Sequence, residues 1–130
     1  MDASRAREEK SGLPRARRLT RSDDIRSIFR RGKRSRTVHL DVFDAASPTG
    51  HPRVGVVVPR YRHSAVARNK VKRRLREALR REILPRLSRR EPALDVLVRA
   101  RREAYGVSFS TLCDELREWL DRRWSSASSS

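Results

Sequence analysis

The spacing of apolar residues changes several times along this chain, and each change marks a predicted element. The first element is a short helix that begins with Ser22 as its N-cap. Its apolar face, at the three- and four-residue steps of a helix, is formed by Ile25, Ile28 and Phe29. Gly32 is expected to end this helix at the C′ position, where glycine is favoured.

Three other stretches alternate apolar and polar residues with the period of a strand. In residues 37–44 the two sides are formed by Val38, Leu40 and Val42 against His39, Asp41 and Phe43. Residues 54–58 are rich in valine, and residues 94–101 alternate again. We expect the first two strands to pair as a hairpin across a long loop, with a further short strand near residues 33–37.

Two longer helices also follow from the periodicity. One begins after Ser64 as its N-cap and runs to about residue 82, and Pro85 is expected to stop it. Its apolar face comprises Ala67, Val71, Leu75, Ala78 and Leu79. The last helix buries a face made of Phe109, Leu112, Cys113, Leu116, Trp119, Leu120 and Trp124. Cys113 is expected to pack there as a small apolar residue.

These elements predict an α+β fold with a single domain, in which one mixed sheet of about four strands packs with three helices. The order is α-β-β-(β)-α-β-α, the bracketed strand being the short one. Residues 1–16 lack periodicity and are expected to form a flexible basic N-terminal arm. Residues 17–124 form the folded domain, and residues 125–130 are expected to be a disordered Ser-rich tail.

The charge of the chain points to a polyanionic partner. Lys and Arg number 33 against 16 Asp and Glu, so the 130 residues carry a formal net charge of +17. Such a charge opposes the compact state by self-repulsion unless a polyanion offsets it. Nucleic acid is therefore the partner we expect first.

Several other classes of protein are disfavoured by the same composition. A single cysteine, Cys113, excludes an internal disulfide, and the three histidines do not have metal-site spacing. We find no apolar run of the roughly 18 residues that a membrane helix needs, and no apolar segment typical of a secretory signal. We therefore expect a cytoplasmic protein that has no membrane association.

Most of the positive charge lies on and around one predicted helix. Residues 60–90 hold thirteen Arg and Lys residues against two Glu. A solvated helix face normally interleaves charges of both signs for pairing at four-residue steps, and this one is almost uniformly basic. The face is therefore expected to bind an anion rather than only water.

Within this helix, residues 68–76 spell R-N-x-x-K-R-x-x-R. This segment closely resembles the signature helix of the bacterial ribonuclease P protein subunit. The flanks agree, with Arg18-Leu19 before a helix that carries Ile28-Phe29, and with Arg53-Val54-Gly55 before the basic helix. The resemblance covers roughly residues 13–124 in the same order and spacing.

The resemblance implies a fold with a βαβ crossover and a protein that is not itself the catalyst. Members of the family bind a large catalytic RNA, and the two together remove 5′ leaders from precursor tRNA with RNA-bound Mg²⁺. The implied partners are thus the catalytic RNA subunit and precursor tRNA, with no obligate protein partner and no cofactor bound by the protein alone. The RNA-binding motif carries over to Arg68, Asn69, Lys72, Arg73 and Arg76.

By the same resemblance, a cleft between the first helix and the sheet holds the single-stranded leader. The matching positions are Phe29, Phe43, Ile25, Val57 and Arg60. Ile25 departs from the family, which commonly has Phe there, so this contact loses aromatic stacking. Phe29 is equally consistent with a plain core residue, and Asn69 can either read a base edge or tie down the preceding loop.

The residues themselves indicate no catalytic or metal site. Asp41 and Asp44 are three apart on a strand, so they face opposite sides of it, and we expect both to face solvent. One alternative is a ribosomal or ribosome-assembly RNA-binding protein without a nuclease role. Another is a DNA regulator, although a recognition helix would usually mix Asn, Gln, Ser and Arg.

Overall fold

Four strands form one mixed sheet in the order β1-β2-β4-β3 in the computed structural model, which describes residues 13–129. The strands are β1 (Lys33–Arg36), β2 (Leu40–Ala46), β3 (Arg53–Val57) and β4 (Leu94–Ala100). β1 pairs with β2 and β2 with β4 in antiparallel fashion, whereas β3 and β4 are parallel. The predicted α+β class and the short additional strand are both confirmed.

The predicted hairpin between the second and third strands is wrong, because β4 lies between them. The reason is the burial of β4 on both faces: Val96, Leu97 and Val98 are all 0% exposed. A strand with apolar residues on both sides gains most at the centre of a sheet. β3 therefore connects to β4 as a parallel pair through the intervening helices, which is the βαβ crossover that the family resemblance implies.

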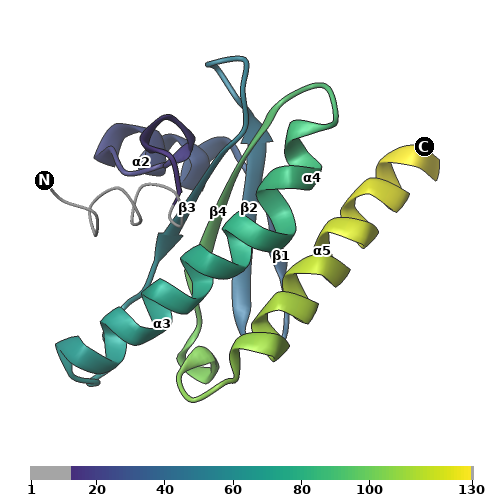
Figure 1. Cartoon of the computed structure of the whole chain (residues 1–130). Coiled ribbons are helices and arrows are strands. Elements are labelled where there is room, and N and C mark those ends of the chain that lie inside the picture. Colours follow the sequence, from purple (N-terminus) through teal and green to yellow (C-terminus); the bar gives the residue numbers. More distant parts are fainter. Residues whose placement is uncertain (1–12, 130) are drawn as a thin grey trace, which may run out of the picture.

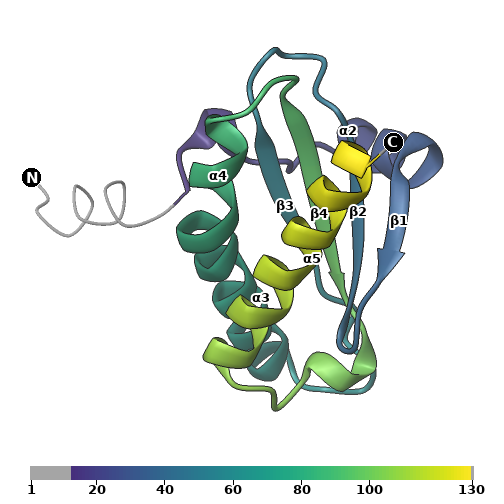
Figure 2. The ribbon, with the colours of Figure 1, turned by 90° about the vertical axis from the view of Figure 1, so that its right-hand side faces the viewer.

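The helices cover the two faces of the sheet unequally (Figures 1 and 2). One face packs against α3 (Ala65–Ala78), η2 (Leu79–Ile83), α4 (Leu84–Ser88) and α5 (Phe109–Ser129) around the larger hydrophobic core. The other face carries α2 (Ser22–Arg31) and a smaller cluster of Leu19, Ile28, Phe43 and Leu97. Between residues 13 and 129, no helix is long and apolar enough to cross a bilayer.

Pro85 does not stop the basic helix as predicted. The helix passes through one π-helical stretch, η2, and continues as α4 with Pro85 in its first turn. There the N–H of Leu84 bonds to the carbonyl of Leu79. A new series of α-helical hydrogen bonds begins at Leu84. The backbone N–H that Pro85 lacks therefore belongs to the first turn of a helix, where its absence costs little.

The two ends of α2 also differ in detail from the prediction. Arg21 rather than Ser22 is the N-cap, and no side chain caps the helix there. Gly32 does follow the helix, but at φ −78° its backbone is not left-handed. A β-carbon at Gly32 would lie 2.6 Å from the carbonyl oxygen of Ile28 and 3.2 Å from that of Asp44. Close approach of backbone, not a positive φ, therefore favours glycine here.

The chain before α2 belongs to the folded domain earlier than predicted. Leu13 is buried in the main core, and η1 (Arg15–Arg17) follows it. The Leu19 N–H then bonds to the carbonyl of Val54 at 2.8 Å, so this segment lies along the edge of β3. The predicted boundary at residue 16 is therefore too late, and the first 12 residues of the predicted arm lie outside the described residues.

Gly55 makes this docking possible. A β-carbon there would lie 2.7 Å from both the β-carbon and the carbonyl oxygen of Leu19. At the other end of the chain, α5 continues to Ser129, so a helical backbone extends past residue 124 into the segment expected to be a disordered tail.

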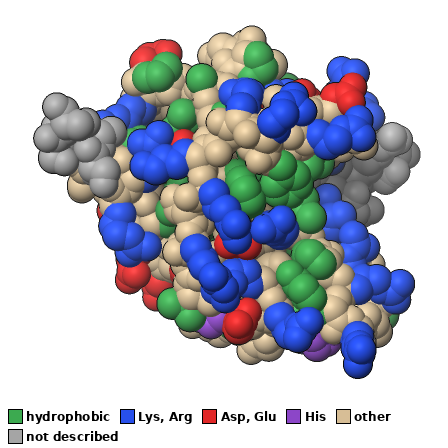
Figure 3. All heavy atoms as spheres, turned by 180° about the vertical axis from the view of Figure 1, so that it is seen from behind, with side chains coloured by type: hydrophobic (Ala, Val, Ile, Leu, Met, Phe, Trp, Pro, Cys, Tyr) green, Lys and Arg blue, Asp and Glu red, His purple; other side chains and the backbone are tan. Residues whose placement is uncertain are grey.

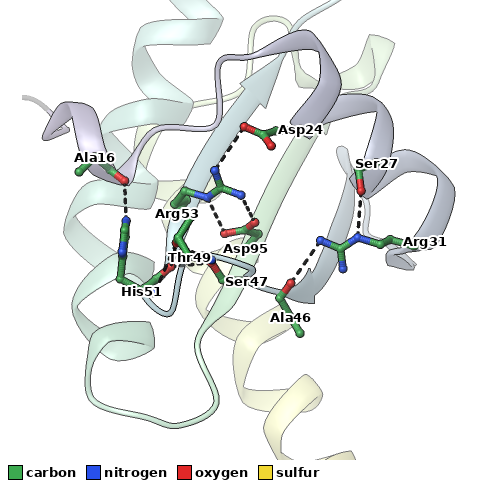
Figure 4. Close-up of polar contacts among 10 residues, drawn as sticks. All are labelled: Ala16, Asp24, Ser27, Arg31, Ala46, Ser47, Thr49, His51, Arg53 and Asp95. Carbon is green, nitrogen blue, oxygen red and sulfur yellow. Dashed lines mark hydrogen bonds and ion pairs between the residues drawn. The ribbon is translucent and has the colours of Figure 1, made fainter.

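A buried ion pair attaches α2 to the sheet (Figure 4). Arg53 donates from Nε and Nη2 to the two carboxylate oxygens of Asp95, at 3.1 and 2.6 Å. Its Nη1 reaches Asp24 of α2 at 3.3 Å. The Asp95 side chain is 0% exposed, so Arg53 is the cation that compensates for the burial of this carboxylate.

Replacing Arg53 with methionine is expected to destabilise the fold by about 3 to 5 kcal/mol, because Asp95 would remain buried without a cation. Arg26→Met is the matched control, since Arg26 pairs with Asp23 at the same 2.6 Å but in solvent. Its cost should stay below about 1 kcal/mol. Urea unfolding of the two variants measures both values, and equal losses would contradict the structural role of Arg53.

Candidate nucleic-acid interface

Helix α3 directs its basic residues outward because its apolar side packs against the sheet. The residues buried there are Val71, Leu75 and Ala78. Ser64 caps the helix as predicted, accepting a hydrogen bond from the Ala67 N–H at 3.1 Å. Asn69 and Arg73 are exposed. Within the described residues, the Asn69 side chain makes no hydrogen bond to the preceding loop, which favours the role of an outward-facing contact.

Arg68 has a different position from its neighbours in the motif. It is half-buried, and its Nε donates to the carbonyl oxygen of Val58 at 2.7 Å. This bond ties the first turn of α3 to the end of β3. Arg68 therefore positions the helix, and only the remaining N–H groups of its guanidinium are available to a ligand.

Lys72 and Arg76 line a groove of about 290 Å³ between α3 and the edge of β3. Arg18, from the segment before α2, lines the same groove. Its apolar lining residues are Leu13, Leu19, Ile25, Val54 and Val56, beside Thr20 and Gly55. No Asp or Glu lies among the lining residues that the structure describes. Three cations therefore meet in a groove that also exposes apolar side chains.

This concentration of charge affects the pKa values of the cations in the groove. Burial lowers the pKa of Lys72, and the nearby Arg76 and Arg68 lower it further. Burial also lowers the pKa of Arg76, with Arg18 adding to the effect. Each cation is thus disfavoured by its surroundings, and an anion placed in the groove would relieve that cost.

Sequence reasoning did not identify Arg18 as a site residue. Only folding of the segment onto β3 brings it beside α3, through the bridge between Arg18 and Val54. Its Nε donates to the carbonyl oxygen of Leu13 at 2.8 Å, which fixes its direction. No local pattern in the sequence carries that information.

Four of the five predicted leader-cleft residues lie together on the other face of the sheet. Ile25, Phe29 and Val57 are partly buried and pack against the cluster that contains Phe43. The rings of Phe29 and Phe43 meet edge to face with centroids 4.9 Å apart. Phe43 is only 5% exposed, so it forms the floor of the cluster while Phe29 borders solvent.

Arg60 is not part of this group. It is exposed, just beyond β3, and within the described residues no ion pair, side-chain hydrogen bond or cation–π contact joins it to the cluster. The cation that does lie on the cluster is Arg99 of β4. Its guanidinium carbon is 5.4 Å from the ring centroid of Phe29 and 5.3 Å from that of Phe43. The strand alternation places Arg99 on the side of Leu97, a signal that could have identified it.

The expectation that Asp41 and Asp44 face solvent is wrong. They are 4% and 2% exposed, on opposite faces of the sheet as expected. Asp41 pairs with Arg34 and Arg99, and Asp44 with Arg123 of α5. These arginines come from distant parts of the chain, so the spacing of the aspartates did not reveal them.

The described residues contain no group of three or more His, Cys, Asp or Glu side chains arranged to hold a metal ion. Within residues 13–125 the acidic groups of the sheet are instead engaged with arginines.

Ile25 connects the two sites, because it lines the groove beside α3 and also packs against the phenylalanine cluster. Viewed from behind, on the face opposite α3, α4 and α5, the molecule shows apolar patches bordered by many Lys and Arg side chains and by fewer acidic ones (Figure 3). This face therefore offers apolar contacts for bases beside cations for phosphates.

The family described as Ribonuclease P matches residues 13–123 of this chain. The ribonuclease P protein component of Syntrophobacter fumaroxidans is 38% identical, over 76% of this chain and 81% of its own length. The component from Acidothermus cellulolyticus is 36% identical, over 85% of this chain and 90% of its own.

Solved structures show the same similarity. The RNase P protein from Thermotoga maritima is 29% identical with a TM-score of 0.68, and the match covers 81% of this chain and 96% of that one. The protein from Staphylococcus aureus is 26% identical with a TM-score of 0.68, covering 84% and 96%. The ribosomal alternative finds no support among these proteins.

The groove predicts a specific response to anions. Sulfate should raise the melting temperature more than sodium chloride at equal ionic strength, because it binds where Arg18, Lys72 and Arg76 meet. Arg76→Ala should reduce that difference, whereas Arg89→Ala, an exposed residue outside the groove, should not. Equal shifts by the two salts in the unmodified protein would mean screening alone.

Proposed function

The chain belongs to the ribonuclease P protein family, and from this premise we propose that its two connected sites bind two different RNAs. It is a protein subunit of the ribonuclease P holoenzyme, an endoribonuclease of tRNA processing, and it associates with the RNase P RNA. In our proposal, the basic surface of α3 contacts the RNase P RNA. The cluster beneath α2 contacts the 5′ leader of precursor tRNA.

The observation that carries the first assignment is the convergence of Lys72, Arg76 and Arg18 on one groove without an acidic neighbour among its described lining residues. Phosphate contacts of this kind supply most of the sequence-independent affinity for RNA. The exposed Arg73 extends the surface along α3. A folded RNA, whose phosphates lie close together, suits such a dense set of cations.

The second assignment rests on the cluster of Ile25, Phe29 and Phe43 with a guanidinium above it. Single strands bind proteins through base stacking on aromatic rings within a positive groove. Phe29 is the ring that borders solvent, and Arg99 provides the positive charge. Ile25 offers apolar contact without stacking. Arg60 remains a candidate for a phosphate further along the leader.

We propose that the protein contributes no catalytic side chain and no metal ligand. The buried carboxylates are paired with arginines, which supports this view. The Mg²⁺ ions of the reaction would then be held by RNA in the holoenzyme, and the protein would position the substrate. A cytoplasmic location, where such a holoenzyme would meet precursor tRNA, belongs to the same proposal.

Lys72→Ala, Arg73→Ala and Arg76→Ala should each weaken binding to the RNase P RNA by about 1 to 3 kcal/mol while the fold persists, since each lies off the buried face of α3. Each lost phosphate contact should also reduce the slope of log affinity against log salt by roughly 0.7 to 0.9. Filter binding over a salt series measures both quantities. Unchanged affinity in all three variants would exclude α3 as the RNA contact.

Phe29→Ala should weaken binding of precursor tRNA to the holoenzyme by about 1 to 3 kcal/mol and leave binding of mature tRNA unchanged, because only the precursor carries a leader. Phe109→Ala is a matched control. Phe109 is also half-buried under an arginine, Arg81 at 5.5 Å, but it lies on α5. The ratio of precursor to mature affinities is the readout, and equal ratios for the two variants would refute the leader site.

A further inference from the structure

Arg99 is held in one orientation by groups on three sides. Its guanidinium carbon lies 5.4 Å from the ring centroid of Phe29 and 5.3 Å from that of Phe43. Its Nη2 donates to Oδ2 of Asp41 at 3.1 Å. A guanidinium restrained in this way loses less entropy when it binds a ligand.

Asp41 is itself fixed in place and charged. Arg34 donates to its other carboxylate oxygen at 3.2 Å. Burial acts to raise the pKa of Asp41, but the hydrogen bonds from Arg99 and Arg34 outweigh it, so that pKa lies below its usual value. Asp41 therefore remains a carboxylate at neutral pH. Arg34 would still neutralise it if Arg99 were removed, so the fold does not depend on Arg99 for this purpose.

The rest of the Arg99 guanidinium borders an open hollow. Its side chain is 33% exposed. The hollow has a volume of about 460 Å³ and is lined by Arg99 together with Asp41, Pro59, Tyr61, Arg101, Arg102 and Glu103. Within the described residues, Asp41 is the only carboxylate paired with Arg99, and that pair uses one of its nitrogens. N–H groups of Arg99 are therefore available to a ligand in the hollow.

We propose that Arg99 is a specificity-determining residue of the leader site. Its free N–H edge binds a pair of acceptors on one leader nucleotide, either two phosphate oxygens or the O6 and N7 atoms of guanine. The proposal rests on the proposed function, because it presumes that the leader occupies the cluster beneath α2. Arg99 covers Phe43, so a leader nucleotide at this point meets the guanidinium before it meets that ring.

This assignment differs from a purely structural role. If Arg99 served only to cover the phenylalanines and to pair with Asp41, its removal would lower stability and would affect precursor and mature tRNA equally. If it binds the leader, its removal affects the precursor alone. The planar guanidinium of Arg99 also matters for binding the leader, because a lysine at this position would supply the positive charge without two parallel N–H donors.

The experiment uses holoenzyme reconstituted with RNase P RNA, and it measures affinities for precursor and mature tRNA at fixed magnesium and salt. Arg99→Ala should lower precursor affinity about tenfold and leave mature tRNA affinity unchanged. Arg99→Lys, which preserves the charge beside Asp41, should recover only part of the loss. Arg81→Ala, which removes a guanidinium from above Phe109, should change neither affinity.

Modified leaders then separate the two acceptor groups. If guanine is bound, 7-deazaguanine at one leader position weakens binding to the unmodified holoenzyme but has no further effect with Arg99→Ala. If a phosphate is bound, a neutral methylphosphonate at one leader position weakens binding to the unmodified holoenzyme but has no further effect with Arg99→Ala. A single sensitive position that loses its effect in Arg99→Ala supports the proposal, and the kind of substitution identifies the acceptor.

An unchanged precursor-to-mature ratio in both Arg99→Ala and Arg99→Lys would overturn the inference. If Phe29→Ala still alters that ratio, the leader site stands and only the role of Arg99 is lost. If neither residue alters it, the leader site fails as well. Should Arg99→Ala unfold, Arg99→Lys decides alone: full precursor affinity with every leader would contradict a role for the guanidinium fork.

Discussion

The need to neutralise carboxylates inside the sheet is the constraint on which the rest of the structure depends. Asp95, Asp44 and Asp41 are all buried, and each is paired with at least one arginine from another element. Because an unpaired buried charge is costly, these pairs join neighbouring strands and fix α5 against the sheet, and Arg53 also holds α2 through Asp24. The chain has a net charge of +17, and the carboxylates that are buried in these pairs cannot neutralise cations at the surface. The outer face of α3 therefore stays positive.

The two faces of the sheet are packed differently, and the proposed function assigns one RNA to each face. The face covered by α3, α4 and α5 holds the larger core, which supports α3 as a rigid basic ridge. The opposite face has only α2 and a small cluster, so aromatic and guanidinium groups remain near solvent there. Ile25 lies at the junction, because it lines the groove beside α3 and packs against the cluster, so the two proposed RNA contacts adjoin there.

Local periodicity was sufficient to predict the strands, the buried helix faces and the basic surface of α3, because each depends on residues close in sequence. The strand order was predicted incorrectly, since the central place of β4 arises from burial on both of its faces. The burial of Asp41 and the place of Arg18 were also missed. Both depend on partners brought together only by the complete fold, Arg99 for one and the edge of β3 for the other.

Site-specific photocrosslinking tests the division between the two faces most directly. Holoenzyme would be assembled with p-benzoylphenylalanine in place of Phe29 or of Arg73, and irradiated with labelled precursor tRNA. The account predicts that position 29 crosslinks to the 5′ leader and position 73 to the RNase P RNA. Crosslinks from position 29 to the RNase P RNA, without any crosslink to the leader, would contradict the account.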